Sequence, residues 1–201
     1  MTKIKICGLS RRCDIGFVNR CGPDYAGFVV NVPKSRRSVT PEEARALSAL
    51  LSPEVMPVGV FVNERAEVVA SMLNDGIIFA AQLHGSEDED YIGDLRRRTG
   101  GILIQAFSVA SPSDMERTAA SPADYVLLDS GGGTGRTFDW RLIKGFKRPY
   151  FLAGGLGADN LPAALAELRP FAVDMSSGVE TGGVKDPAKI EAAVAAVRRY
   201  S

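Results

Sequence analysis

The chain has 201 residues, 45% of them hydrophobic, and its 24 lysines and arginines balance 24 aspartates and glutamates. This length and apolar fraction fit a folded domain with a sizeable core and exclude intrinsic disorder. The balanced charge argues against a nucleic-acid or polybasic membrane partner, and neither a transmembrane run nor a signal peptide is recognisable, so we expect a cytoplasmic protein.

Eight short apolar runs recur along the chain, and their starts are 22 to 32 residues apart. The expected strands are Lys3–Leu9, Tyr25–Val30, Pro57–Val62, Phe79–His84, Ile102–Phe107, Asp124–Asp129, Pro149–Gly154 and Phe171–Ser176. This spacing is typical of a compact unit of one strand and one helix. Eight such units predict an α/β fold, a single (β/α)₈ barrel domain over residues 1–201, close to the minimum length for that fold.

Helix start signals stand between these strands. Capping residues, with a proline or an acidic residue following, predict helix starts at Thr40, Ser86, Ser111 and Asp186. The last pattern, Pro187–Arg199, places its apolar residues on one stripe and predicts an amphipathic helix. The sixth unit is the weakest, because Asp139–Phe146 is short for a helix and contains a glycine.

Cysteine and histidine usage restricts the chemistry. The three cysteines, Cys7, Cys13 and Cys21, form no C-x-x-C pair, and the only histidine, His84, is distant in sequence. A zinc site is therefore not expected, and a reducing compartment would keep the thiols free. The sequence also lacks the G-x-S-x-G motif that would accompany a serine nucleophile.

Two glycine-containing strand ends suggest a phosphate site. The seventh predicted strand ends in Gly154 and Gly155, and the eighth ends in Ser176, Ser177 and Gly178. The loops after these strands form the usual phosphate site of this barrel, where backbone N–H groups can cradle an anion. Alternatively, the glycines only make tight turns. Because neither a Rossmann nor a P-loop motif is present, we expect a phosphorylated metabolite rather than a dinucleotide.

Strand alternation sorts the side chains that face the barrel interior. On the first strand, Cys7 and Lys5 share the face that points into the barrel. Asp129 lies on the inward face of the sixth strand, at its carboxyl-terminal end. A thiol and a carboxyl group facing one pocket can act as base and acid, although a buried cysteine or a turn-capping aspartate would look the same. We expect Lys5 to pair with Asp174 on the neighbouring strand, and His84 to be a hydrogen-bonded polar residue at its strand end.

Motifs along the whole chain support a resemblance to one family. They are Lys5–Leu9, Gly27–Val29, Pro33–Val39, Val58–Asn63, Gln82–Gly85, Leu127–Ser130, Gly132–Gly135 with Phe138–Trp140, Ala153–Leu156 and Val173–Glu180. In this order and spacing, the chain resembles the phosphoribosylanthranilate isomerases of tryptophan biosynthesis. The resemblance implies an Amadori rearrangement of a small phosphoribosyl substrate, with no cofactor, no metal and no obligate protein partner.

The resemblance also implies roles for individual residues. Cys7 would be the general base that removes the C2′ proton, and Asp129 the general acid that protonates the ribose ring oxygen. Arg37 would hold the anthranilate carboxylate, and Gly154, Gly155, Ser176, Ser177 and Gly178 would bind the phosphate. The loop after the second strand is one residue longer than the family's, which leaves Arg36 as the alternative carboxylate ligand. Lys5 is a candidate to favour the Cys7 thiolate.

Two other functions fit parts of the same pattern. One is a related phosphate-binding barrel, such as an isomerase for a different aminoaldose, and the other is a catalytically inactive regulator that binds a phosphosugar. A regulator would retain the phosphate loops but would need neither Cys7 nor Asp129, so the presence of both residues favours the enzyme.

Overall fold

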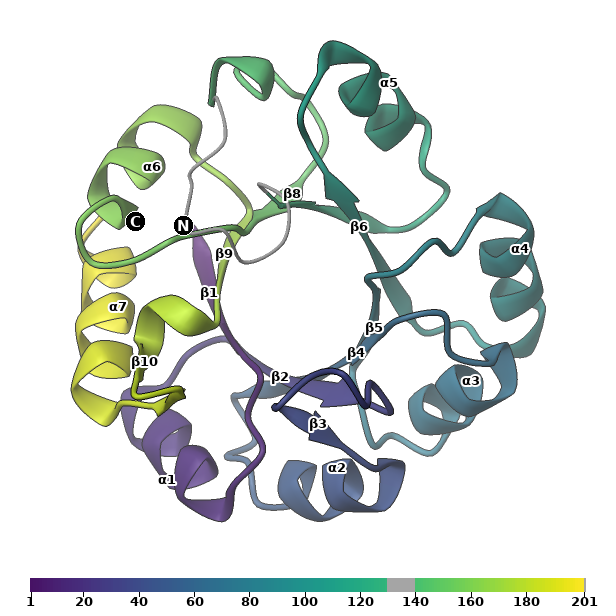
Figure 1. Ribbon diagram of the computed structural model, residues 1–201, viewed down its shortest axis with the longest axis horizontal. Coiled ribbons are helices and arrows are strands. Elements are labelled where there is room, and N and C mark those ends of the chain that lie inside the picture. The colour runs from purple at the N-terminus through teal and green to yellow at the C-terminus, as the bar shows by residue number, and fades with distance from the viewer. Residues whose placement is uncertain (130–139, 201) are drawn as a thin grey trace.

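The computed structural model describes residues 1–129 and 140–200, and eight parallel strands form a closed barrel in it (Figure 1). The barrel strands are β1 (Lys3–Cys7), β2 (Tyr25–Val30), β4 (Met56–Phe61), β5 (Ala80–Leu83), β6 (Ile102–Ser108), β7 (Tyr125–Asp129), β8 (Tyr150–Leu152) and β9 (Ala172–Met175). Each strand pairs with its neighbours in chain order, and β1 closes the ring by pairing with both β2 and β9. The predicted barrel is therefore confirmed.

Helices surround the ring on the outside (Figure 1). They are α1 (Arg12–Cys21), α2 (Pro41–Ser48), α3 (Ala66–Asn74), α4 (Glu89–Arg98), α5 (Pro112–Ala120), α6 (Leu161–Leu168) and α7 (Pro187–Arg199). Between β7 and β8 the described residues hold only the 3₁₀ helix η1 (Trp140–Leu142), in agreement with the weak sixth helix pattern. The glycine-rich motif 132–135 lies outside the described residues. No helix within 1–129 and 140–200 is long and apolar enough to span a membrane.

Short elements complete the carboxyl-terminal end of the barrel. Strand β3 (Ser38–Val39) pairs with β2. The 3₁₀ helix η2 (Ser177–Val179) follows β9 and leads into a hairpin of β10 (Glu180–Thr181) and β11 (Val184–Lys185). These elements bring the chain after β2 and the chain after β9 to the same rim.

Three of the four predicted helix starts are confirmed, and one is wrong. Thr40 caps α2 in a capping box, Ser111 caps α5, and Asp186 caps α7. Helix α4, however, begins at Glu89 with Asp88 as its N-cap, not at Ser86. The Glu87 carboxylate instead accepts hydrogen bonds from the backbone N–H groups of Asn63 and Gly85. The Ser86 hydroxyl, which would have capped the predicted helix, donates to Oδ1 of Asn63.

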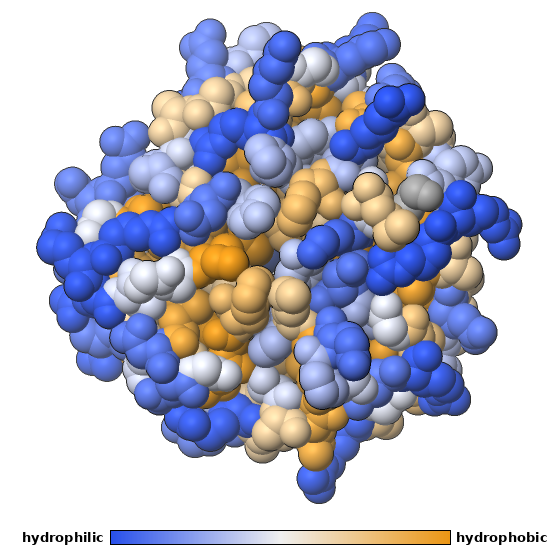
Figure 2. All heavy atoms as spheres, turned by 180° about the vertical axis from the view of Figure 1, so that it is seen from behind, coloured by the Kyte–Doolittle hydropathy of each residue, from blue (hydrophilic) through white to orange (hydrophobic). Residues whose placement is uncertain are grey.

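Two apolar layers hold the barrel together. The larger layer lies between the strands and the helices, and the smaller one fills the barrel interior. Aromatic rings close the amino-terminal end of the interior: Tyr25 packs against Phe151, and Tyr125 stacks on Phe171 with ring centroids 4.9 Å apart. Seen from behind, hydrophobic residues appear around the middle of the molecule and hydrophilic ones along its rim (Figure 2). The aromatic rings thus fill the interior at the amino-terminal ends of the strands.

Candidate active site

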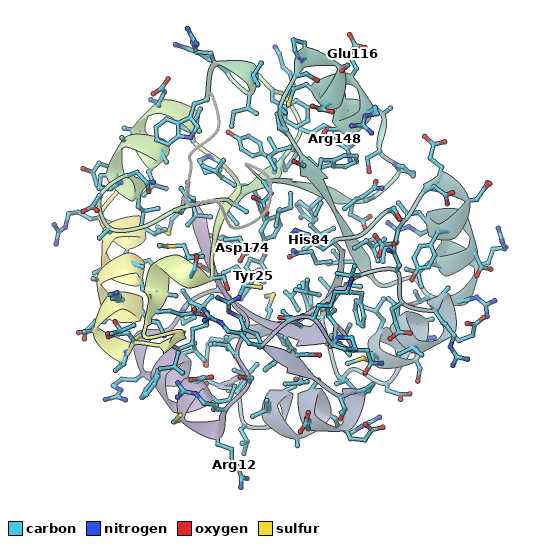
Figure 3. The ribbon with its side chains drawn as sticks, viewed as in Figure 1. Arg12, Tyr25, His84, Glu116, Arg148 and Asp174 are labelled. Atoms are coloured by element: carbon cyan, nitrogen blue, oxygen red, sulfur yellow. The ribbon has the colours of Figure 1, made fainter. Side chains whose placement is uncertain are left out.

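A cavity of about 540 Å³ lies at the carboxyl ends of the strands. All eight predicted site residues line it: Cys7, Arg37, Asp129, Gly154, Gly155, Ser176, Ser177 and Gly178. Gln82, His84 and Asp174 also contribute to its wall. His84 and Asp174 lie toward the middle of the ring from different strands (Figure 3). Residues from six strand ends or loops thus meet in one place, as expected for this fold.

The Cys7 side of the cavity contains buried charge. The ammonium group of Lys5 donates to Oδ2 of Asp174 over 2.9 Å, and the Lys5 side chain is fully buried. This confirms the predicted pair across β1 and β9. Gly27, opposite Cys7 on β2, leaves room for both groups, because a Cβ there would stand 2.9 Å from Cys7 Sγ and 3.0 Å from Lys5 Nζ. The thiol and the ammonium group are therefore close neighbours.

Burial and charge act in opposite directions on the Cys7 thiol. Burial raises the pKa of Cys7 above its ordinary value, while the positive charge of Lys5 lowers it and the negative charge of Asp174 raises it. Burial dominates, so the net pKa is raised. The expected help from Lys5 is present but does not on its own produce a thiolate at neutral pH.

The Asp129 side is more open and is organised by an amide side chain. Asp129 Oδ2 lies 3.6 Å from His84 Nε2, and the Asp129 side chain is 19% exposed. The side-chain amide nitrogen of Gln82 lies 2.8 Å from His84 Nδ1. Because an amide nitrogen can only donate, Nδ1 accepts, and a neutral His84 ring then carries its proton on Nε2, facing Asp129. His84 is thus both the hydrogen-bonded residue we expected and a neighbour of the predicted acid.

Arg36 and Arg37 both lie at the cavity rim, but only Arg37 forms a two-point contact there. Arg37 donates from Nε and Nη2 to the two carboxylate oxygens of Glu180, over 2.7 and 2.8 Å. Arg36 donates through Nη2 alone, over 2.7 Å. The stem of Arg37 passes directly over Gly8, where any side chain would overlap it. This packing favours Arg37 over Arg36 as the residue that faces the cavity.

The two predicted phosphate loops pack against each other. Gly178 stands so close to the carbonyl oxygen of Leu156 that a Cβ would overlap it, which requires glycine at this position. Within the described part of the chain, the backbone N–H groups of Gly154 and Gly155 donate no hydrogen bond. Ser176 and Ser177 lie beside them on the cavity wall. Free N–H groups at a concave glycine turn can bind an anion.

Sequence reasoning missed three residues of this site: Gln82, Glu180 and Lys185. Gln82 and Glu180 stood in motifs of the family resemblance, but their partners cannot be inferred from spacing. Glu180 and Lys185 are buried polar residues in the β10–β11 hairpin. The Gly182–Gly183 pair could have predicted that hairpin, because two glycines in a two-residue turn are a strong hairpin signal. Within the described residues, no cluster of three or more His, Cys, Asp or Glu side chains could hold a metal ion.

Known proteins with the same fold and sequence pattern identify the family. The model of the N-(5′-phosphoribosyl)anthranilate isomerase family matches residues 4–196. An isomerase of that name from Endomicrobium trichonymphae is 46% identical over 195 residues, which cover 94% of this chain and 95% of the relative. The phosphoribosylanthranilate isomerase structure from Thermotoga maritima matches with a TM-score of 0.88 at 38% identity, covering 99% of this chain and 100% of that one.

A further solved structure carries a ligand. It is a phosphoribosylanthranilate isomerase in complex with reduced 1-(o-carboxyphenylamino)-1-deoxyribulose 5-phosphate, and it matches with a TM-score of 0.85 at 38% identity, over 99% of this chain and 100% of that one. The match of a whole barrel, in sequence and in structure, leaves one assignment: this chain belongs to the N-(5′-phosphoribosyl)anthranilate isomerase family.

Proposed function

We propose that this chain converts N-(5-phosphoribosyl)anthranilate to 1-(2-carboxyphenylamino)-1-deoxyribulose 5-phosphate, with Cys7 as general base and Asp129 as general acid. Family membership supports the reaction. One observation carries the residue roles: a thiol, a carboxyl group, an arginine and two glycine-containing loops line one cavity. The substrate is a small phosphoribosyl compound, and we place the protein in the cytoplasm.

The reaction needs two protons delivered and two removed. Asp129 donates a proton to the ribose ring oxygen as the C1′–O bond breaks, and the anthranilate nitrogen supplies the electron pair that forms the C1′=N⁺ imine. The Cys7 thiolate then removes the C2′ proton to give an enolamine. The enolamine gains a proton at C1′ and loses its hydroxyl proton at C2′, which yields the ketone. The rearrangement involves no net oxidation or reduction, so acid and base side chains are sufficient to catalyse it.

The two ends of the substrate carry negative charge, and the cavity offers a matching group at each end. Arg37 is the proposed ligand of the anthranilate carboxylate, because a guanidinium group binds a carboxylate through two parallel hydrogen bonds. Gly154, Gly155, Ser176, Ser177 and Gly178 are the proposed phosphate ligands. Within residues 1–129 and 140–200 the backbone N–H groups of Gly154 and Gly155 donate no hydrogen bond, which supports this assignment.

The test of the acid and base follows the anthranilate fluorescence of substrate generated in situ. We expect Cys7→Ala and Asp129→Asn each to lower kcat by roughly 10²–10⁴, the usual contribution of a general acid or base. Cys13→Ala is the matched control, because Cys13 is exposed on α1. Near wild-type turnover of either site variant would remove that residue from the mechanism. Ligand binding without turnover by the wild-type protein would favour the inactive regulator instead.

Arg37 has a separate test in the substrate dependence. Arg37→Ala should mainly raise KM, because the carboxylate is held in the ground state and in the transition state alike. Arg36→Ala should have the smaller effect, since Arg36 contacts Glu180 through one nitrogen only. An unchanged KM for Arg37→Ala together with a raised KM for Arg36→Ala would reverse the assignment.

A further inference from the structure

We propose that Glu180 is a positioning residue for Arg37: the β10–β11 hairpin holds the Arg37 guanidinium in the orientation that receives the carboxylate of the substrate. This inference rests on the carboxylate-binding role of Arg37 proposed above. It adds a residue that does not touch the substrate but determines how tightly the carboxylate end of the substrate binds.

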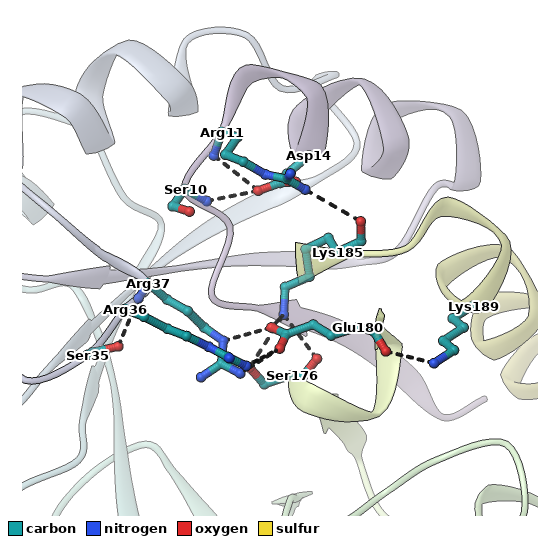
Figure 4. A network of polar contacts seen from close by, with 10 residues as sticks. All are labelled: Ser10, Arg11, Asp14, Ser35, Arg36, Arg37, Ser176, Glu180, Lys185 and Lys189. Atoms are coloured by element: carbon teal, nitrogen blue, oxygen red, sulfur yellow. Dashed lines mark hydrogen bonds and ion pairs between the residues drawn. The ribbon is translucent and has the colours of Figure 1, made fainter. Parts of the chain in front are cut away.

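The hairpin places two opposite charges face to face. Glu180 on β10 lies directly across from Lys185 on β11, and the turn between them is a glycine pair in which both residues have positive φ. Lys185 Nζ donates to Glu180 Oε1 over 2.7 Å. It also donates to the Ser176 carbonyl oxygen over 3.0 Å. Glu180 is thereby tied both to its own hairpin and to the loop after β9 (Figure 4).

Glu180 uses one edge of the Arg37 guanidinium and leaves the other open. The hydrogen bonds from Nε and Nη2 occupy the side edge of the group. The end edge consists of Nη1 and the second hydrogen of Nη2, and Nη1 forms no hydrogen bond within the described part of the chain. A guanidinium group has five donors in a rigid plane, so a second carboxylate can bind at the end edge.

Burial strengthens the ion pair between Glu180 and Arg37. The Glu180 side chain is 4% exposed and that of Arg37 is 23% exposed, whereas Arg36 is 59% exposed. Although burial alone would raise the pKa of Glu180, hydrogen bonds from Arg37 and Lys185 lower it to about 2. Glu180 therefore stays ionised at neutral pH, and its bonds to Arg37 are charge-assisted and directional.

Preorganisation gives the contact its functional value. A free arginine side chain loses rotational freedom when it binds a ligand, and this loss weakens binding. Here Glu180 orders Arg37 before the substrate arrives, and the packing of the Arg37 stem over Gly8 restricts it further. Lys185 joins the same carboxylate to Ser176, a predicted phosphate ligand. The hairpin thus links the groups that bind the two ends of the substrate.

The test compares two ligands by calorimetry. The first is reduced 1-(o-carboxyphenylamino)-1-deoxyribulose 5-phosphate, and the second is ribulose 5-phosphate, which lacks the aryl carboxylate. We expect Glu180→Gln to lower the affinity for the first ligand by about 10-fold or more, which is the range for the loss of a hydrogen bond to a charged group. The affinity for the second ligand should fall by less than about threefold. An equal loss for both ligands would show a general structural role and overturn the proposal.

A paired variant separates positioning from folding. Glu180→Gln leaves the Lys185 ammonium buried without its partner, which can destabilise the protein. Glu180→Gln combined with Lys185→Met removes both buried charges, yet Arg37 still lacks its anchor. We expect the melting temperature of this double variant to lie closer to that of wild type than the melting temperature of Glu180→Gln does. The affinity for the carboxylate ligand should still be selectively lowered. Recovery of carboxylate affinity together with stability would contradict positioning.

A mutant cycle with Arg37 completes the design. In the Arg37→Ala background, Glu180→Gln should lower the affinity for the carboxylate ligand by less than about a further twofold, because the guanidinium group that Glu180 positions is gone. Additive losses would refute the proposal. The same variants distinguish the proposed role of Arg37 from that of Glu180. If Arg37→Ala itself leaves carboxylate affinity unchanged, the proposed role of Arg37 is wrong. If Arg37→Ala weakens binding and Glu180→Gln does not, only the positioning role is wrong.

Discussion

The two sides of the cavity are built by different means. On the Cys7 side, Lys5, Asp174 and Cys7 are buried together, and ionic contacts fix their positions. On the Asp129 side, a neutral amide orients His84, and both His84 and Asp129 remain partly exposed. The proposed base is thus enclosed by the protein itself, while the proposed acid still contacts solvent in the free protein.

The contrast shows how the two proposed catalytic groups depend on their neighbours. A buried ion pair is costly to break, because the remaining charge stays in a medium of low polarity. A hydrogen bond between neutral groups near solvent contributes much less, because water can replace the lost partner. We therefore expect substitutions on the Cys7 side to affect folding and chemistry together, and substitutions on the Asp129 side to affect chemistry alone.

The largest expected effect is the loss of stability in Lys5→Met. Removing the ammonium group leaves Asp174 buried without its partner, at a cost of about 3–5 kcal/mol in the free energy of unfolding. Urea denaturation measures the change. Lys5→Met combined with Asp174→Asn removes both charges and should recover most of the loss. A single variant as stable as wild type would show that the pair does not hold the base side together.

The second effect concerns the reactivity of the Cys7 thiol. Because burial raises its pKa, the thiolate is a minor species at neutral pH. Inactivation by iodoacetamide should therefore still increase about tenfold per pH unit between pH 7 and pH 8.5. Asp174→Asn should speed inactivation, since the Asp174 charge raises that pKa. Cys7→Ala gives the background rate from other thiols. A rate that levels off below pH 8 would mean that Lys5 dominates over burial.

The third effect is a pH dependence of stability that arises in the β10–β11 hairpin. The folded-state pKa of Glu180 is about 2, below its value of roughly 4.3 in an unfolded chain. The resulting stability is fully present above the unfolded value and is lost as the pH falls toward 2. Acid unfolding should thus be less steep over this range in the Glu180→Gln, Lys185→Met double variant. Identical acid profiles would mean that the Glu180 contacts add no net stability.

The same contrast explains which parts of the molecule the sequence could predict. Strand alternation is a local rule, so the inward positions of Lys5, Cys7 and Asp129 follow from counting residues along each strand. The Lys5–Asp174 pair followed because β1 and β9 must be neighbours in a closed barrel. Buried ionic contacts inside the barrel are therefore accessible to reasoning from topology.

Contacts between loops were not predictable in this way. Arg37 and Glu180 are 143 residues apart, and their meeting depends on the shapes of two loops rather than on a strand register. The wrong start predicted for α4 has a similar cause, because the hydroxyl of the predicted cap, Ser86, donates to the side chain of a distant loop residue, Asn63. Local capping rules hold unless a tertiary partner takes the capping group.

The smallest expected effect lies on the Asp129 side and tests the contrast directly. Gln82→Leu removes the amide group that contacts His84 Nδ1, and it also removes Gln82 Oε1, a buried acceptor without a hydrogen bond in the described residues. Stability should change by less than about 1 kcal/mol, because the loss and the gain oppose each other. kcat should fall by about 5- to 10-fold, since one hydrogen bond that orients His84 toward Asp129 is lost.

Nitrogen NMR of the His84 ring provides the decisive readout. In wild type the neutral ring should carry its proton on Nε2, and in Gln82→Leu the two neutral forms should mix. A kcat loss with an unchanged tautomer would mean that Gln82 acts on the reaction by another route. A large loss of stability in this variant would remove the distinction between the two sides, because a neutral contact would then support the fold as strongly as the buried ion pair does.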